Sequence, residues 1–264
     1  MRPWQTMRFL LQLVRLNLRA AMAYRAGFIA GVGFMALNDM MWIIFWTLFF
    51  SRFPALRGWT LDDVVTMWAV VATGFGIATG FFGNCRAEGV RVIVSGRMDY
   101  YLSLPRNVVL HYLGGSISVA AFGDILFGVL AYALAVQPAP ARWPLFILLA
   151  LAVAVIMLSF GLLLNSLAFW IGNSEGLGQQ ILNVMITFST YPLDLFGVAV
   201  KVALFTIIPA GFTGYLPVTV LREFDPWRLG ATVAFAAALL ALAMRVFYAG
   251  LRRYESGSLV ATQG

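Results

Sequence analysis

The sequence has few of the side chains that enzymes most often use for chemistry. It contains one cysteine, Cys85, one histidine, His111, and one lysine, Lys201. A single cysteine excludes an intramolecular disulfide and a cysteine zinc cluster. A single histidine excludes a histidine pair that would hold a metal. Since no His, Cys and carboxylate residues recur with catalytic spacing, we expect neither a metal site nor catalytic residues in this chain.

The sequence also lacks a nucleotide-binding phosphate loop. Such a loop needs a glycine-rich turn followed by Lys and then Ser or Thr. The only lysine, Lys201, is followed by Val202. We therefore expect that the chain does not hydrolyse ATP by this route.

Charged residues are scarce as a class. Of the 264 residues, 11% are charged and 61% are hydrophobic, and the mean hydropathy is +0.86. A soluble domain has about 25% charged and about 45–50% apolar residues. A bilayer-spanning helix needs roughly 20 mostly apolar residues, so a chain of this length supplies about six of them. The composition predicts an all-α integral membrane protein, with one transmembrane domain over residues 1–264.

Six apolar stretches are expected to cross the bilayer. They lie at about 27–50, 62–83, 108–136, 144–170, 178–196 and 229–249. A further apolar stretch, 198–216, contains Pro209, Gly211 and Gly214 and is followed by Pro217. A straight helix with these residues would leave backbone groups unpaired in lipid. We expect this stretch to form a re-entrant pair of half-helices before the last span.

The basic residues indicate the orientation. Within residues 1–25, Arg8, Arg15 and Arg19 share one face of a helix, which predicts an amphipathic helix lying on the lipid headgroups. A frayed basic tail is the alternative. Six spans place the five arginines of residues 1–25 on one side together with Arg86, Arg91, Arg97, Arg106, Arg245, Arg252 and Arg253. The opposite side then holds Arg52, Arg57, Arg142, Arg222 and Arg228.

Because basic residues concentrate in cytoplasmic loops, both termini are expected in the cytoplasm and the chain in the cell (inner) membrane. The net charge of +7 is explained by topology and by contact with anionic membrane lipid, and we expect no nucleic-acid partner. Cys85 is expected at the cytoplasmic end of the second span, within reach of a thiol reagent.

Two carboxylates, Asp39 and Asp124, fall inside expected spans. An ionised carboxylate there costs about 2.5–3.5 kcal/mol unless it is paired or hydrated. Two interpretations remain open. The residues line a translocation path, or they make a structural hydrogen bond to a neighbouring helix, for instance involving Asn38 or Asn165. If they bind protons, the chain is instead an ion-coupled secondary transporter.

The most unusual polar stretch is 84–107, between the second and third expected spans. Ser95-Gly96 provides a break, and Asp99 is expected near the N-terminus of a short helix, where a negative charge is favoured. Pro105 prevents that helix from continuing. The apolar residues of this stretch, Met98, Tyr100, Leu102 and Leu104, are more than a solvated loop needs. They indicate contact with a surface.

Several short motifs occur in a characteristic order. They are Gly96-Arg97-Met98-Asp99 followed by Leu102 and Pro105, then Tyr191-Pro192, then Ile208-Pro209 followed by Tyr215-Leu216-Pro217, and finally Arg252-Arg253-Tyr254-Glu255-Ser256. With this order, the amphipathic helix and the six spans, the chain resembles the permease subunits of type-2 ABC exporters. It is most similar to the short six-span branch whose ATPase is a separate chain.

The resemblance covers nearly the whole length and implies a set of partners. The chain would form a dimer, with a second copy or with a sister permease, docked on cytoplasmic ABC ATPase subunits. These subunits would bind the ATP and Mg, so this chain would carry no cofactor. The exporter would move an amphiphilic or hydrophobic substrate.

The resemblance also implies where the ATPase docks. The main coupling helix would lie at about Arg97 to Leu104, a second contact near Glu175, and the re-entrant segment on the outer side of the path. The residues expected to couple to the ATPase are Arg97, Met98, Asp99, Tyr100, Leu102, Leu104, Pro105 and Glu175.

Overall fold

The computed structural model describes residues 3–104 and 107–254, and the elements in this part are helices. In the first half they are α1 (Pro3–Met22), α2 (Arg25–Arg52), α3 (Leu61–Phe81), η1 (Gly83–Cys85), α4 (Ala87–Val94), α5 (Met98–Leu102), α6 (Val108–Leu113), α7 (Ala121–Leu130) and the π-helix η2 (Ala131–Val136). In the second half they are η3 (Pro140–Arg142), α8 (Trp143–Ser166), α9 (Ala168–Ile171), α10 (Glu175–Ser189), η4 (Leu193–Leu195), α11 (Val198–Thr206), the π-helix η5 (Gly211–Tyr215), α12 (Leu216–Arg222) and α13 (Pro226–Leu251).

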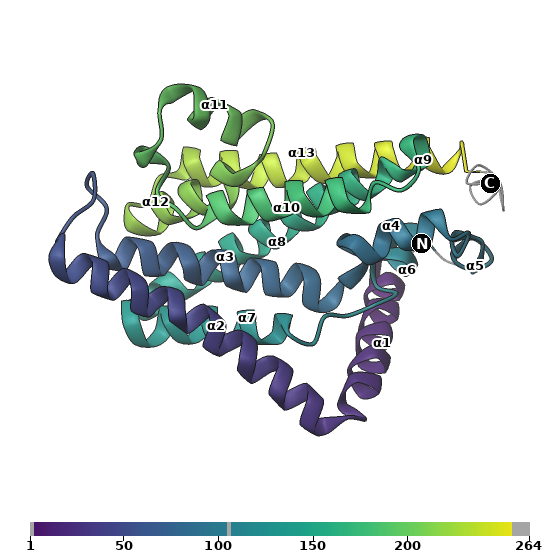
Figure 1. Ribbon diagram of the computed structural model, residues 1–264, viewed down its shortest axis with the longest axis horizontal. Coiled ribbons are helices and arrows are strands. Elements are labelled where there is room, and N and C mark those ends of the chain that lie inside the picture. Colours follow the sequence, from purple (N-terminus) through teal and green to yellow (C-terminus); the bar gives the residue numbers. More distant parts are fainter. Residues whose placement is uncertain (1–2, 105–106, 255–264) are drawn as a thin grey trace.

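The helices α3, α10 and α13 run along the long axis of the molecule, and α2 crosses them obliquely (Figure 1). Four helical segments are long and apolar enough to cross a membrane: α2, α3, the segment Pro140–Ile171 and α13. They correspond to the first, second, fourth and sixth expected spans. The all-α membrane fold is thus confirmed.

Two expected spans are shorter than the apolar stretches that suggested them. The stretch 108–136 divides into α6 and the helix Ala121–Val136, separated at residues 114–120. The stretch 178–196 corresponds to α10, which ends at Ser189 and is followed by Pro192 and the short η4. A count of six spans therefore stays a prediction.

The stretch 198–216 is a broken helix, as its proline and glycines suggest. α11 and the segment Gly211–Arg222 meet at an angle of 84° across the break that contains Pro209. The segment Gly211–Arg222 continues six residues beyond residue 216, where the expected stretch ended. Pro217 is tolerated because it lies in the first turn of α12, where its missing N–H costs no hydrogen bond. The re-entrant path of this segment relative to lipid stays a prediction.

The amphipathic N-terminal helix is present and lies across the direction of α3 and α8 (Figure 1). Its stripe of Arg8, Arg15 and Arg19 is exposed. Asn17 donates a hydrogen bond from Nδ2 to the carbonyl of Gly114, at 2.9 Å, which holds α1 against the C-terminal end of α6. This crosswise placement is consistent with a helix that lies along a membrane surface.

The core is built around α3. In the most apolar part of α3, 83% of the residues are buried, whereas in that of α2 only 6% are. Glycines allow the close packing that this burial needs. A Cβ at Gly76 would lie 2.6 Å from the carbonyl oxygen of Ala121 in α7, and one at Gly123 would lie 2.4 Å from that of Val32 in α2. The helices α2, α3 and α7 thus approach at backbone distance.

Candidate functional site

The α4–α6 end of the molecule is held together by a buried asparagine. Asn84 donates from Nδ2 to the carbonyl of Tyr112, at 2.7 Å, and its Oδ1 accepts a hydrogen bond from Ser116. Its carbonyl oxygen accepts a hydrogen bond from Asn165 Nδ2 in α8, also at 2.7 Å. These bonds satisfy backbone groups where helix α6 stops, as a buried chain break requires. Asn165 is thus engaged here and not with Asp39 or Asp124.

Helix α5 is separated from α4 by the expected break. Gly96 has φ of +77°, a conformation that favours glycine, and Asp99 lies in the first turn of α5. The side chains of Tyr100 and Leu102 are 66% and 42% exposed, and Leu104 is half-buried. Arg97 and Asp99 are exposed as well. Pro105 lies outside the described residues.

The sequence predicts that Met98 contacts a partner, but in the structure it packs inside the protein. Its side chain is fully buried, in a cluster that includes Ile93 of α4, Tyr112 of α6 and Phe247 of α13. The first apolar residue of α5 therefore anchors this helix to the protein. The later ones, Tyr100 and Leu102, remain on the surface.

The residues after the last long helix contact the same break. Tyr254 donates a hydrogen bond to the carbonyl of Gly96, at 3.0 Å, and its ring lies edge-on to Phe169 at 6.2 Å between centroids. Burial, together with a hydrogen bond to Asp99, raises the pKa of the Tyr254 hydroxyl to about 12. The C-terminal end of α13 thus supports the position of α5.

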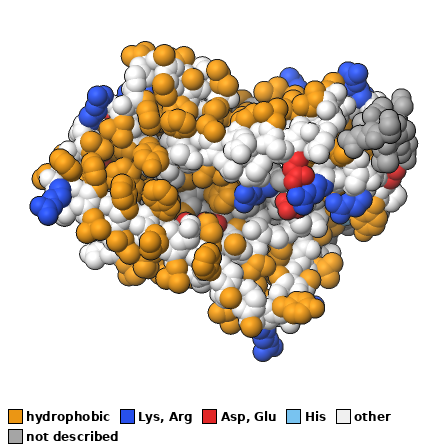
Figure 2. Space-filling view, in the orientation of Figure 1, with side chains coloured by type: hydrophobic (Ala, Val, Ile, Leu, Met, Phe, Trp, Pro, Cys, Tyr) orange, Lys and Arg blue, Asp and Glu red, His pale blue; other side chains and the backbone are white. Residues whose placement is uncertain are grey.

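Glu175 lies in the first turn of α10 and forms a two-pronged ion pair with Arg91 of α4. Arg91 donates from Nε and Nη2 to the two carboxylate oxygens, at 2.9 and 2.5 Å. This hydrogen bonding lowers the pKa of Glu175 below its ordinary value. Arginine and glutamate side chains gather over α4 and the start of α10 (Figure 2). The ion pair thus joins the start of α10 to α4, the helix that precedes the expected coupling helix.

Cys85 lies at this end, at the C-terminal side of α3, but it is 3% exposed. A Cβ at Gly161 of α8 would lie 2.2 Å from the Cys85 carbonyl oxygen, so the two segments are in close contact. The expectation that Cys85 is accessible to a thiol reagent is therefore wrong, and introduced cysteines must report the topology.

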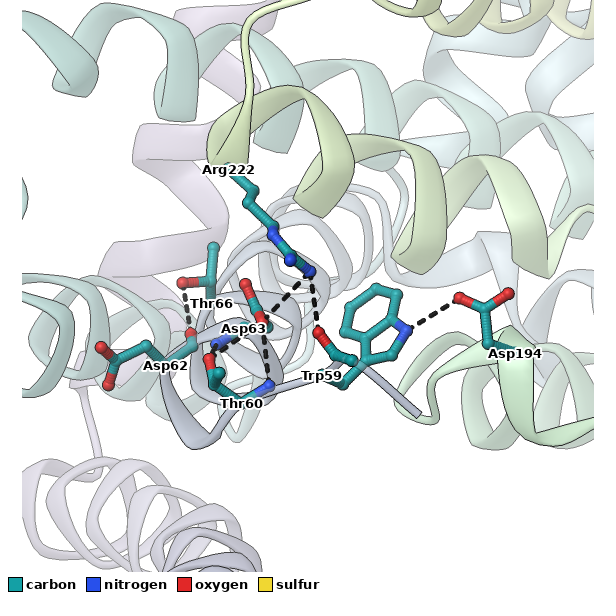
Figure 3. Close-up of polar contacts among 8 residues, drawn as sticks. Trp59, Thr60, Asp62, Asp63, Thr66, Asp194 and Arg222 are labelled. Carbon is teal, nitrogen blue, oxygen red and sulfur yellow. Dashed lines mark hydrogen bonds and ion pairs between the residues drawn. The ribbon is translucent and has the colours of Figure 1, made fainter. Parts of the chain in front are cut away.

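The opposite end of the molecule has a network of internal polar contacts (Figure 3). Asp194 accepts a hydrogen bond from Trp59 Nε1, at 2.8 Å, and forms an ion pair with Lys201 of α11. Arg222 of α12 donates to the Gly58 carbonyl, at 3.1 Å, and lies 3.5 Å from Asp63. The broken segment 198–222 is thereby tied to the turn that precedes α3.

Between the two ends, Asp39 of α2 and Asp124 of α7 lie against each other, within hydrogen-bonding reach. They are 5% and 4% exposed. Both line a cavity of about 330 Å³. Asn38 is also a neighbour of Asp39, as one interpretation proposed. The structure thus joins two residues that are 85 positions apart in a single acidic site.

No group of three or more His, Cys, Asp and Glu side chains in the described residues could hold a metal ion. Inspection of the sequence missed the partners of the site residues. Arg91, Asn84 and Asn165 contact groups on other helices, and single-sequence periodicity gives no such pairing. Tyr254 belongs to the motif Arg252-Arg253-Tyr254-Glu255-Ser256, which is visible in the sequence, but its hydrogen bond to Gly96 depends on the fold.

A model of the family described as ABC-2 family transporter protein matches residues 36–258. This range includes α4, α5, Glu175, both buried aspartates and the broken segment 198–222. Among curated proteins, none matches the sequence significantly. The match covers most of the chain and agrees with its apolar, all-helical structure. The chain belongs to the ABC-2 family of transporter proteins.

Proposed function

We propose that the chain is the permease subunit of an ATP-driven exporter whose ATPase is a separate polypeptide, and that α5 transmits motion from that ATPase. The family match supports a membrane-embedded permease of an ABC transporter that works with an ATPase. One observation supports α5 as the docking site: Tyr100 and Leu102 are exposed on this short helix, while Met98 of the same helix is buried in the protein.

The contacts around α5 support its role as a lever. The Arg91–Glu175 ion pair connects α4 to the start of α10, and Tyr254 connects α5 to the end of α13. Force applied to Tyr100 and Leu102 would therefore reach three helices. Alternating access needs this kind of coupling between a docking surface and the spans.

The proposal also includes the orientation in the membrane, the number of permease chains and the class of substrate. The α4–α6 end faces the cytoplasm, with both termini on that side, and the segment 198–222 lies at the outer side. Two permease chains, identical or related, enclose the path, and the substrate is amphiphilic or hydrophobic. α1 begins and α13 ends at the same end of the molecule, which supports an even number of crossings (Figure 1).

The test is to purify the full-length tagged chain from gently solubilised membranes of its own source. An ABC ATPase, identified by mass spectrometry through its phosphate-binding lysine motif, is expected to co-purify and to give ATP hydrolysis. The chain stripped of that subunit is expected to give none. Robust hydrolysis by the stripped chain, or reproducible absence of any ABC ATPase, would contradict the proposal.

A second candidate, an ion-coupled secondary transporter, is favoured by one observation, the contact between Asp39 and Asp124. Transport that persists after removal of the ATPase would support it. Transport that stops would support the exporter.

A further inference from the structure

The cavity beside Asp39 and Asp124 combines buried negative groups with aromatic walls. The apolar surface of the cavity includes Met35, Trp42, Trp68, Phe75 and Tyr191. Two threonines also line it, Thr187 in the last turn of α10 and Thr190 directly after that helix. The rings of Trp42 and Trp68 stack with centroids 5.4 Å apart and an interplanar angle of 23°. In Figure 2 the surface is hollowed between α2 and α10, and acidic atoms are visible inside the hollow.

Two polar atoms of this cavity have no hydrogen-bond partner within the described protein. Asp39 is 5% exposed, and its Oδ2 atom has no hydrogen-bond partner there. Trp68 is 9% exposed, and its indole Nε1 has none either. Buried polar groups of native proteins are usually hydrogen-bonded, so these two atoms are available to a molecule that enters the cavity.

The charge of the cavity is not balanced by a close cation. Among the described residues, no ion pair engages Asp39 or Asp124. Arg86 acts on Asp124 electrostatically without forming an ion pair with it, and its guanidinium carbon lies 5.5 Å from the centroid of the Phe75 ring. Two desolvated carboxyl groups that touch share a proton or, when both are ionised, repel each other, and a cation placed against them stabilises the ionised pair.

The walls determine which cation fits. A divalent metal ion prefers six or more oxygen ligands. Besides the two carboxylates, the lining has the neutral polar residues Asn38, Thr187, Thr190 and Tyr191, and the rest of it is apolar. Aromatic faces attract organic cations, and desolvation strengthens that attraction. A volume of about 330 Å³ is in the range of small-molecule sites, which is roughly 300–1,000 Å³.

We propose that this cavity binds a lipophilic organic cation, with its positive centre against Asp39 and Asp124 and its apolar groups against Trp42 and Trp68. The inference rests on the proposed function, since it names the class of molecule that the permease would move. Asp39 and Asp124 would then be binding residues on the path.

The direct test is equilibrium binding to the purified full-length chain, with two probes of nearly equal size and opposite charge. The probes are tetraphenylphosphonium and tetraphenylborate, measured by dialysis and by quenching of tryptophan fluorescence. The chain carries a net charge of +7, so non-specific attraction favours the borate. A saturable preference for the phosphonium would therefore report a local acidic site.

Three variants locate that site. Asp39→Asn and Asp124→Asn remove one carboxylate each from the cavity, and Asp62→Asn removes one at the start of α3, away from the cavity lining. We expect each cavity variant to weaken phosphonium binding about tenfold or more, because a close charge pair in a partly desolvated site is worth several kcal/mol. Asp62→Asn is expected to bind like the wild type.

Size-exclusion profiles and thermal unfolding check that the variants fold. If a cavity variant does not fold, the two probes on the wild-type chain still decide the matter. Equal saturable binding of both probes, or none, would overturn the inference. So would a phosphonium preference that survives both cavity substitutions.

The ATPase content of the same wild-type preparation separates this inference from the proposed function. Co-purified ATPase without phosphonium binding would overturn the cation site alone. Phosphonium binding by a chain that never associates with an ATPase would support the site and contradict the proposed exporter.

Discussion

The two ends of the molecule use polar residues in different ways. At the end with segment 198–222, the carboxylates of Asp63 and Asp194 contact cations or an indole of the same chain. At the α4–α6 end, polar contacts hold the helices in place but leave Tyr100 and Leu102 exposed. The first end is closed in one sense: these carboxylates are engaged within the chain, although apolar side chains such as Phe224 are exposed there too. The second end differs because the buried Met98 holds its exposed residues on a fixed support, as expected of a docking surface.

The largest expected effect concerns the support of α5. Replacing the fully buried Met98 with alanine should destabilise the protein by about 2–5 kcal/mol, because it leaves a cavity in the cluster with Phe247. Thermal unfolding in detergent measures this loss. Leu102→Ala, on the exposed part of the same helix, should change stability by less than about 0.5 kcal/mol. Equal losses in both variants would contradict the description of α5 as anchored at one side.

The next effect concerns the exposed face of α5. Tyr100→Ala should leave unfolding unchanged and reduce ATPase affinity by about 30-fold or more, the usual loss for an aromatic side chain central to an interface. Co-purification at graded salt and titration with purified ATPase measure the affinity. Phe224→Ala is the matched control, since Phe224 is 63% exposed at the opposite end. Similar affinity losses in both variants would abolish the distinction between the two ends.

A smaller effect is expected at the closed end. Asp194→Ala removes the acceptor of Trp59 and the partner of Lys201, and should cost about 1–3 kcal/mol of stability. The ATPase should still bind, because the substitution lies far from α5. Asp62→Asn, at the same end, serves as the control in the same unfolding assay. If Asp194→Ala unfolds like the wild type, the network in Figure 3 contributes little to the fold.

The smallest effect concerns the exposed Arg91–Glu175 pair. Its hydrogen bonds lower the pKa of Glu175, so the pair stabilises the folded chain above the ordinary carboxylate pKa and loses this contribution as pH falls through the lowered value. The difference in Tm between wild type and Glu175→Gln should therefore be constant near neutral pH and disappear in strong acid. Glu88→Gln serves as a control on α4. A difference that grows toward acid would show the opposite sign of coupling.

The general fold follows from the sequence because hydrophobicity is a local property. The apolar runs of α2, α3, α8 and α13 are each long enough to be recognised alone. The divided third stretch was not foreseen, because the groups at and beside its break, residues 114–120, exchange hydrogen bonds with Asn84, which lies about 30 positions earlier: Asn84 donates to the Tyr112 carbonyl and accepts from Ser116. Runs of apolar residues carry no signal for such a contact.

The site residues show the same limit. The break at Gly96 and the position of Asp99 at the start of α5 follow from local chemistry, and the structure has both. The burial of Met98 does not, because it depends on helices α4, α6 and α13 meeting around it. Likewise, the sequence identified Asp39 and Asp124 as costly residues, but only the packing of α2 against α7 brings them together.

The central claim is that the α5 end docks the ATPase, and cysteine cross-linking tests it most directly. Tyr100→Cys and Phe224→Cys are placed separately in a Cys85→Ser background and treated with a short thiol-to-amine cross-linker in membranes that contain the assembled transporter. The two positions have similar exposure, 66% and 63%, at opposite ends. The account predicts a cross-link to the ATPase from Tyr100→Cys and none from Phe224→Cys. A cross-link from Phe224→Cys, or an assembled transporter without one at Tyr100→Cys, would contradict it.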